Sequence, residues 1–377
     1  MKKLIIIAIL ILVLVLAVAA ILISNPDLVD FLPQQATNES QEPSDTMSVP
    51  PKTAPPTEPP TEAPTEEPTE EPTEAPTEEI PQETEPPVVV ELEENWATVL
   101  AGHTLTAKNY FIYDMGQGAY LDISQGTEGA KLYPASITKL WTAFVALRYV
   151  DPEQKITVGN ELSLIAHDSS IAFLQPGDVL TAEELVSAMM LLSGNDATFA
   201  LTTAVGRILL NNPKASATLA MERFVFQMNA LAKHYGLENS HFVTPDGIHD
   251  ENHYISTEDM VTLGKLAWAH PVLSKYAATA SATKTFSKER TLNWPNSNML
   301  LHKSSPYYCS YAVGLKTGYT TPAGNCLLSA FKVGSQELLI GVFGSPSSDE
   351  RFADTLLLFT QVYDLEIPEP VDTEQAA

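Results

Sequence analysis

The sequence predicts an α+β fold in which an antiparallel sheet is flanked by helices. Strand-like segments lie at both ends of residues 95–366, and helix-like segments fill the middle. Strands grouped at the two ends pair with one another in an antiparallel sheet, whereas strands and helices that alternate along the chain build a parallel one. Residues 95–377 number 283, which is enough for one sizeable domain or two small ones.

Local patterns predict the elements in order. Residues 109–124, NYFIYDMGQGAYLDIS, are typical of two short strands around a turn at Gly116–Gly118. The segment Ser136–Val150 has no glycine or proline and is apolar on nearly every face, which predicts a buried helix. Thr181 and Glu184 have capping-box spacing at the start of the next helix. Further helices are expected at 181–193, 217–235 and 256–270, strands at 311–320, 324–334 and 336–344, and a closing helix at 348–363.

The first residues of the chain predict a membrane anchor. Twenty consecutive apolar residues occupy 4–23 behind Lys2 and Lys3, and about twenty residues span a bilayer as a helix. Cleavable signal peptides usually have apolar regions of about 7 to 15 residues. The length therefore favours a single-pass anchor that holds Lys2 and Lys3 inside and the rest of the chain outside. Cleavage after Ala20, which would release a secreted protein, is the alternative.

A proline-rich linker follows this span. Fifteen of the 28 prolines lie between Pro33 and Pro87, and almost no apolar residue there can pack a core. Proline fixes φ and the glutamates repel one another, so an extended, disordered spacer is expected. The chain is therefore divided into a transmembrane signal anchor at 1–24, a disordered Pro/Thr/Glu-rich linker at 25–94, the folded domain at 95–366 and a C-terminal tail at 367–377.

The charge distribution argues against nucleic acid as a partner. The net charge of the whole chain is -26, but Pro33–Glu94 alone carries seventeen acids against one base. Residues 95–377 carry 28 acids and 18 bases, which makes the folded part only mildly acidic. It has no basic stripe with interleaved aromatic residues that could neutralise phosphates.

The two cysteines, Cys309 and Cys326, are expected to be structural thiols rather than a disulfide. An exported domain permits a disulfide, but Cys326 lies in an apolar strand-like run. In a hairpin over 312–332, we expect Cys326 to lie opposite a position near Gly314 rather than near Cys309. Neither cysteine has the spacing of a metal or redox motif.

Ser136 and Lys139 form the first candidate for chemistry. Positions i and i+3 share a helix face, so the lysine amine can approach the serine hydroxyl. Burial disfavours the charged lysine, and a neutral amine is a plausible base. Unpaired amides at the helix start face any oxyanion that forms there. The four residues thus offer a nucleophile, a base and part of an oxyanion hole.

Two further motifs support a catalytic role for Ser136 and Lys139. LLSGNDAT places Ser193 and Asn195 after an apolar helix, and GLKTGYT places Lys316, Thr317 and Gly318 on an apolar strand. The S-x-x-K, S-x-N and K-T-G set in this chain order is found in penicillin-binding proteins and class A β-lactamases. From about Asn109 to Tyr363 the chain resembles the serine D-alanyl-D-alanine carboxypeptidases, low-molecular-mass penicillin-binding proteins of the β-lactamase-like superfamily. The long segment 224–260 favours the carboxypeptidases over the lactamases.

The resemblance implies a role for each motif residue. Ser136 would attack a D-Ala-D-Ala stem peptide of peptidoglycan and form an acyl-enzyme, and β-lactams would acylate the same serine. Lys139 would be the base. The remaining implied roles are proton relay for Ser193, hydrogen bonds to Lys139 and the substrate amide for Asn195, carboxylate binding for Lys316, Thr317 and Arg351, an open strand backbone for Gly318, and an oxyanion hole from the amides of Ser136 and Tyr319.

Other activities remain open at this stage. A β-lactamase is one alternative, although the chain has no convincing glutamate motif for water activation, and a non-catalytic peptidoglycan-binding protein is another. The motifs also leave open endopeptidase or transpeptidase action on the same class of bond. The eight histidines show no H-E-x-x-H or other ligand spacing, so no metal and no cofactor are expected.

Overall fold

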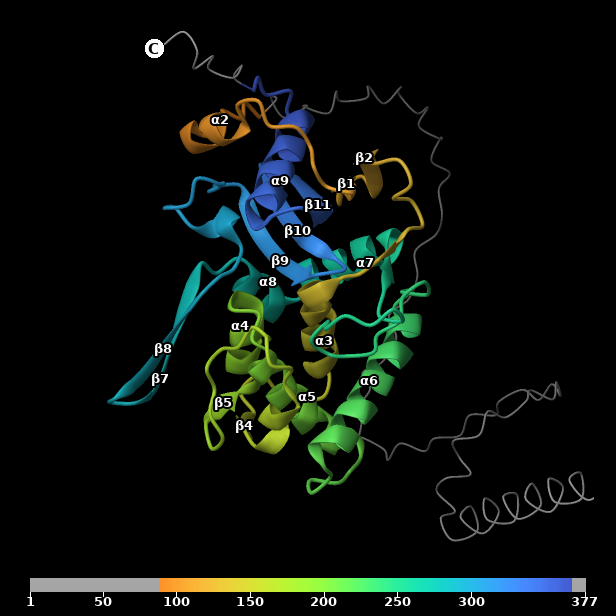
Figure 1. Cartoon of the computed structure of the whole chain (residues 1–377), viewed down its shortest axis with the longest axis vertical. Helices are drawn as coiled ribbons and strands as arrows, with labels where there is room; N and C mark the ends of the chain where they lie inside the picture. The colour runs from red at the N-terminus through yellow and green to blue at the C-terminus, as the bar shows by residue number, and fades with distance from the viewer. Residues whose placement is uncertain (1–87, 368–377) are drawn as a thin grey trace, which may run out of the picture. The chain divides into compact units, whose positions relative to one another are not determined.

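The computed structural model describes residues 88–367, whose centre is a five-stranded antiparallel sheet (Figure 1). The strand order is β2-β1-β11-β10-β9, so the first strands of the domain pair directly with the last ones. Ile112 of β1, for example, lies opposite Ile340 of β11. The predicted α+β architecture is thereby confirmed. The strands are β1 (Asn109–Asp114), β2 (Ala119–Ile123), β9 (Ala312–Thr320), β10 (Gly324–Val333) and β11 (Gln336–Ser345).

Helices cover both faces of this sheet (Figure 1). On one face, Phe331 of β10 stacks on Phe359 of α9, and Trp96 of α2 packs edge-on against the same ring. On the other face, Gly264 of α7 lies against Leu339 of β11, where an added Cβ would come within 2.8 Å of a leucine methyl group. Full burial of each large side chain stabilises the fold by roughly 1.5–3 kcal/mol. The bounding helices are α2 (Glu94–Leu100), α7 (Thr257–Ala269) and α9 (Ser348–Val362).

A helical region extends the second face. Short strand pairs join its helices, and the hairpin of β7 and β8 projects from the body in Figure 1. Its helices are α3 (Thr138–Ala146), α4 (Ala182–Leu191), α5 (Asn195–Leu209), α6 (Ala217–His234) and α8 (Pro271–Ala277), with 3₁₀ turns η2 (Ala135–Ile137), η3 (Asn160–Leu164) and η4 (Met299–Leu301). The strand pairs are β3 (Lys131–Leu132) with β6 (Ile255–Ser256), β4 (Lys155–Thr157) with β5 (Val179–Thr181), and β7 (Ser281–Ser287) with β8 (Arg290–Pro295).

Four helices differ from the prediction, and two of them are the short helices α2 and α8, which were not expected. The helix expected over Ser136–Val150 is shorter, because η2 precedes α3 and α3 ends at Ala146. The helix α5 was not predicted, since Gly194 and several threonines weaken the helical pattern. Some of the threonine hydroxyls find hydrogen-bond acceptors in the helix backbone. The Thr198 hydroxyl, for example, donates to the Gly194 carbonyl at 2.8 Å. By contrast, the capping box of Thr181 and Glu184 is confirmed.

The predicted register of the β9–β10 hairpin was wrong. Cys326 lies opposite Gly318, not near Gly314, because the turn closes between Thr320 and Gly324. Both cysteines are free and buried, as expected. Burial raises the pKa of the Cys326 thiol to about 11, so this thiol stays protonated and unreactive near neutral pH.

The membrane anchor and most of the linker predicted for the N-terminal part lie outside the described residues. Within 88–367, no helix combines the length and the apolar character that crossing a bilayer requires. The predicted span at 4–23 and most of the predicted linker precede this range.

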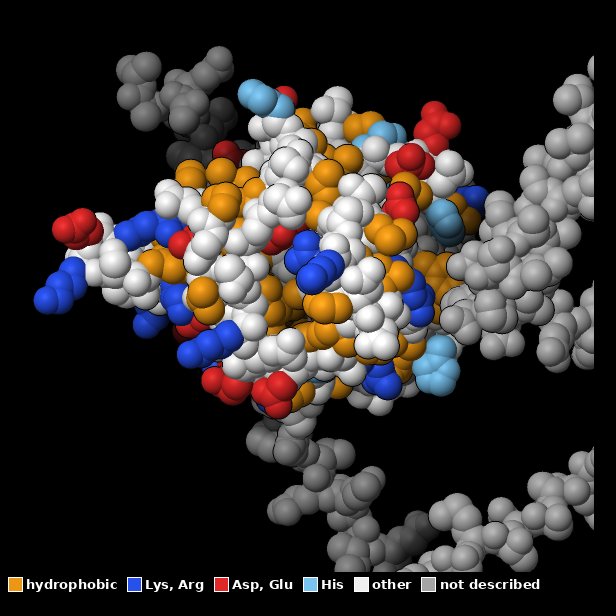
Figure 2. All heavy atoms as spheres, turned by 90° about the horizontal axis from the view of Figure 1, so that it is seen from below, with side chains coloured by type: hydrophobic (Ala, Val, Ile, Leu, Met, Phe, Trp, Pro, Cys, Tyr) orange, Lys and Arg blue, Asp and Glu red, His pale blue; other side chains and the backbone are white. Residues whose placement is uncertain are grey.

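Figure 2 shows the helical face of the domain, where lysine and arginine side chains stand in separate groups.

Candidate active site

Most of the residues singled out by the motifs line one pocket of about 260 Å³, whereas Lys139 and Lys316 are fully buried and are not part of its wall. Ser136 of η2 lies in its wall, beside the edge of β9. Two loops and the start of α5 close the other sides. The remaining wall consists of segments 168–170, 246–248 and 317–320, with Leu192, Ser193, Asn195, Ser297 and Arg351.

Ser136 and Lys139 are in direct contact. The Lys139 Nζ atom donates to Ser136 Oγ at 3.0 Å and to the backbone carbonyl of Asp246 at 2.8 Å. Lys139 is fully buried, whereas Ser136 faces the pocket and is half-buried. The lysine is therefore held under the serine by two acceptors, and the hydroxyl stays open to a ligand.

The buried position of Lys139 changes its acidity. Burial is the largest cause, and it lowers the pKa of Lys139 from 10.5 to about 8. The carboxylates of Asp246 and Asp196 oppose this effect and keep the pKa from falling further. A neutral amine is therefore accessible near neutral pH, as a general base requires.

Two glycines bring the backbone close to the serine. A Cβ on Gly247, which has a φ of +83°, would lie 1.9 Å from the Ala135 carbonyl oxygen. A Cβ on Gly318 would lie 2.8 Å from the Pro134 carbonyl oxygen and 3.2 Å from the Ser136 nitrogen. The family resemblance implied that Gly318 leaves the strand backbone open for the substrate. The structure gives it a second reason, because β9 packs directly against the turn that carries Ser136.

Ser193 and Asn195 lie at the junction of α4 and α5. Ser193 has a φ of +60°, and its buried Oγ has no hydrogen-bond partner among residues 88–367. Asn195, the first residue of α5, donates from Nδ2 to Asp246 Oδ2 at 2.7 Å. The resemblance implied a hydrogen bond between Asn195 and Lys139, and none is present among residues 88–367. The Asn195 amide donates to Asp246 instead.

Lys316 and Thr317 lie on β9, where Thr317 lines the pocket and Lys316 is fully buried. Burial lowers the pKa of Lys316 well below its usual value, and the nearby charges of Lys139 and Arg351 act in the same direction. Lys316 Nζ donates to the Thr317 carbonyl at 3.2 Å, and the Thr317 hydroxyl shares a 2.6 Å hydrogen bond with Ser297. Lys316 is thus a buried cation site with no acidic partner in the part of the chain described.

Arg351 reaches the same strand from α9. Its guanidinium donates to the Gly318 carbonyl at 3.3 Å and to the Ser348 hydroxyl at 2.9 Å. Burial lowers the pKa of Arg351 to about 10, and its Nε atom has no partner within 88–367. Arg351 therefore lines the β9 end of the pocket with an unpaired Nε donor, and an anion there would pair with its guanidinium.

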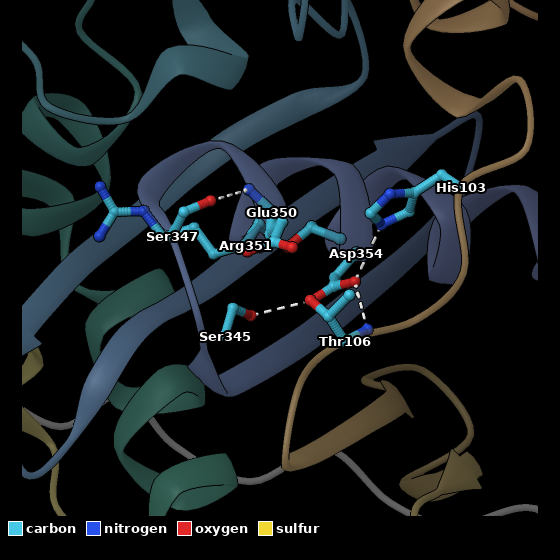
Figure 3. Close-up of polar contacts among 8 residues, drawn as sticks. His103, Thr106, Ser345, Ser347, Glu350, Arg351 and Asp354 are labelled. Carbon is cyan, nitrogen blue, oxygen red and sulfur yellow. Dashed lines mark hydrogen bonds and ion pairs between the residues drawn. The ribbon is translucent and has the colours of Figure 1, made fainter.

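The position of α9 is fixed by a buried carboxylate one turn beyond Arg351. Asp354 accepts hydrogen bonds from His103 Nε2 at 3.0 Å, from the Thr106 nitrogen at 2.8 Å and from the Ser345 hydroxyl at 2.8 Å. Figure 3 shows that the Arg351 side chain extends away from this cluster. One side of α9 is therefore tied to β11 and the N-terminal segment, and the other presents Arg351 to the pocket.

Comparison with known proteins identifies the family. The family model described as D-alanyl-D-alanine carboxypeptidase, Peptidase_S11, matches residues 95–347, which is more than half of the chain. The chain belongs to this family. The resemblance predicted from the three motifs is thereby confirmed.

Curated relatives and solved structures agree with the assignment. D-alanyl-D-alanine carboxypeptidase DacC of Escherichia coli is 30% identical over 266 residues, which cover 68% of this chain and 61% of DacC. DacF of Bacillus subtilis is 28% identical and is covered to 59%. The chain thus spans about three-fifths of the length of these relatives. The Streptomyces K15 DD-transpeptidase structure has a TM-score of 0.62 at 26% identity and covers 70% of this chain and 99% of its own.

Two site residues of this family member were not found from the sequence. Asp246 lies outside the three motifs, although its carboxylate and carbonyl contact Asn195 and Lys139. His253 was not singled out; its Nε2 atom lies 2.9 Å from the Thr138 hydroxyl, and its Nδ1 atom accepts from the Val243 nitrogen at 3.1 Å. Neither residue belongs to the three motifs, and these contacts join segments far apart in the chain.

Because His253 is buried, we expect the folded protein to be less stable in acid. Burial lowers its pKa from 6.5 to about 4, so the unfolded chain binds a proton that the folded chain rejects between these values. We expect the free energy of unfolding to fall as the pH drops from about 6.5 to about 4, with His253 contributing about 3 kcal/mol. Urea unfolding of the native chain and His253→Gln at several pH values measures this contribution.

The fully exposed His167 provides the control for this experiment. His167→Gln should retain the native pH dependence, whereas His253→Gln should flatten it. An equal slope for His253→Gln and the native chain would contradict the assignment of a buried, neutral imidazole.

Proposed function

We propose that this chain is a serine D-Ala-D-Ala carboxypeptidase that removes the terminal D-alanine from peptidoglycan stem peptides. The observation that carries the proposal is the 3.0 Å contact between Lys139 Nζ and Ser136 Oγ in a pocket lined by the two other motifs. Family membership supports the same reaction class. β-Lactams would inhibit the enzyme by acylating Ser136.

The first step is acylation. Neutral Lys139 takes the proton of Ser136, and Oγ attacks the carbonyl carbon of the penultimate D-alanine. The backbone N–H groups of Ser136 and Tyr319 stabilise the oxyanion, where one donor typically contributes about 3 kcal/mol. When the C–N bond breaks, the leaving amine takes a proton through the unpartnered hydroxyl of Ser193. Water then hydrolyses the ester with Lys139 as the base.

The β9 end of the pocket binds the carboxylate of the substrate. In the described range, Lys316 and Arg351 donate to backbone carbonyls and form no ion pair with an acidic residue, and Thr317 contributes a hydroxyl at the same edge. An incoming carboxylate supplies the missing negative charge and accepts these hydrogen bonds. This arrangement selects peptides that end at the residue after the scissile bond, which is the requirement for a carboxypeptidase.

Transfer of the acyl group to an amine is the second candidate activity. It is favoured by the similarity to a solved structure titled a DD-transpeptidase. The described pocket wall contains no glutamate; its carboxylates are those of Asp168 and Asp246, and Asp246 is hydrogen-bonded to Asn195. We therefore rank transpeptidation above β-lactamase activity.

We further propose that residues 4–23 anchor the catalytic domain on the outer side of the cell membrane and that the proline-rich linker spaces it from the bilayer. Support comes from the twenty apolar residues and the two preceding lysines. Cell fractionation tests this proposal: the full chain should sediment with membranes, and a chain that lacks 4–23 should not. Release of the full chain into the medium would indicate cleavage instead.

Mass spectrometry of the full chain, purified in detergent, tests the catalytic proposal. Incubation with an acylated Lys-D-Ala-D-Ala peptide should release D-alanine, and benzylpenicillin should give a long-lived covalent adduct. Fast penicillin hydrolysis would favour a lactamase, and peptide binding without D-alanine release would favour a non-catalytic binding protein. A new amide product in the presence of glycylglycine would identify transpeptidation.

A further inference from the structure

Asp246 lies at the centre of the contacts beneath the pocket. Its carboxylate is buried, with only 2% of the residue exposed. Oδ2 accepts from Asn195 Nδ2 at 2.7 Å, and Oδ1 accepts from the Ile248 nitrogen at 3.2 Å. Its backbone carbonyl accepts from Lys139 Nζ at 2.8 Å. One residue thus contacts both the predicted base and the predicted substrate-binding amide.

The carboxylate decides how the Asn195 amide is oriented. A carboxylate oxygen accepts hydrogen bonds only, so the amide nitrogen must face Asp246. A turn of the amide by 180° would bring two acceptor oxygens to within 2.7 Å of each other. The Asn195 oxygen is therefore directed away from Asp246, and the residue lies in the pocket wall. The amide can then accept a hydrogen bond from a ligand N–H group.

We propose that Asp246 is a positioning residue for acylation: it fixes the Asn195 amide through its carboxylate and holds Lys139 beside Ser136 through its carbonyl and its charge. The inference rests on the proposed function. The role of Asp246 adds to the proposed function a residue that lies outside the three motifs. Asp246 touches no reacting atom in this arrangement and acts through Asn195 and Lys139.

The charge of Asp246 has a consequence that a purely structural residue would lack. Lys139 is faced by Asp246 from the 246–248 loop, by Asp196 from α5 and by Lys316 from β9. Burial lowers the pKa of Lys139, and Asp246 is the largest influence that raises it. Removal of this charge should lower the pKa of Lys139 below about 8. The pH profile of acylation should then move toward acid.

The test compares acylation of the full chain and Asp246→Asn by benzylpenicillin from pH 5 to pH 10. The new amide can pair with Asn195 in either orientation, so we expect the plateau rate constant to fall roughly 10- to 100-fold. The midpoint of the profile should move to lower pH by about half a unit or more. In an Asn195→Ala background, the same substitution should lose most of its effect on the rate but keep the shift of the midpoint.

Asp259→Asn is the matched control, because Asp259 is equally buried and accepts from Ser240 and Asn239 at the start of α7. It should reduce stability without moving the midpoint. Asp246→Ala, which removes the charge without adding an amide, provides a second variant. An unchanged midpoint and a rate within twofold of native would overturn the proposal, and so would failure of both Asp246 variants to fold. If the native chain forms no adduct, the proposed function itself fails.

Discussion

Ser136→Ala is expected to abolish the covalent penicillin adduct and to reduce D-alanine release by at least about 1,000-fold. Ser136 Oγ is the hydroxyl in contact with Lys139, at 3.0 Å, so its removal leaves the base with no proton to accept. The residue faces the pocket, and alanine fits the turn without a new contact. The variant should therefore fold and still bind peptide. Intact-protein mass spectrometry and a D-alanine assay measure both effects.

Ser187→Ala is a suitable control for this variant. Ser187 is buried on α4 outside the pocket wall, and its hydroxyl has no hydrogen-bond partner in the described part of the chain. Its replacement should leave the adduct and D-alanine release near the native values. An adduct that forms on Ser136→Ala at native yield would assign the chemistry to a different nucleophile and end the proposal.

The sequence predicts those parts of this fold that depend on local patterns. The three last strands have continuous apolar runs between turns, and the capping box at Thr181 is a four-residue signal. The pairing of the first and last strands follows from their positions at the two ends of the domain. The Ser136 and Lys139 spacing predicted contact within one helical turn, and the two atoms are 3.0 Å apart.

The contacts that the sequence could not give join distant segments. Asn195 and Asp246 are 51 positions apart, and Lys139 and Asp246 are 107 apart. No local pattern states which backbone carbonyl a buried lysine will meet. The positive φ angles of Ala135 and Ser193 are equally hidden, because neither residue type favours that conformation. These contacts and backbone conformations were therefore not predicted, although the motifs around them were found.

Two buried cations at one end of the pocket also require explanation. Lys316 and Arg351 have no ion pair within residues 88–367, and burial lowers the pKa of both. An isolated buried charge is costly, so burial favours the neutral form of Lys316. A ligand carboxylate would offset that cost directly. Peptide amides, which lack the C-terminal carboxylate, should accordingly bind much more weakly than the free acids.

Lys139→Met is expected to reduce the acylation rate constant by roughly 100- to 10,000-fold, the usual contribution of a general base. Methionine approximates the length of lysine and suits a fully buried site, so folding should be retained. In the native chain the pKa of Lys139 is about 8, and only the neutral amine can accept the Ser136 proton. The rate constant should therefore rise with pH, reach half its maximum near pH 8 and then level off.

The pH profile separates this role from a simpler electrostatic one. If Lys139 served only as a cation that stabilises negative charge, acylation would be fastest where the amine is protonated and would fall above pH 8. Stopped-flow acylation by a chromogenic β-lactam measures the profile for the native chain, Lys139→Met and the exposed control Lys275→Met. Lys275→Met should match the native profile. If the acylation rate constant of the native chain falls above pH 8, Lys139 is not the general base. The deprotonated amine, which must accept the Ser136 proton, would then be the inactive form.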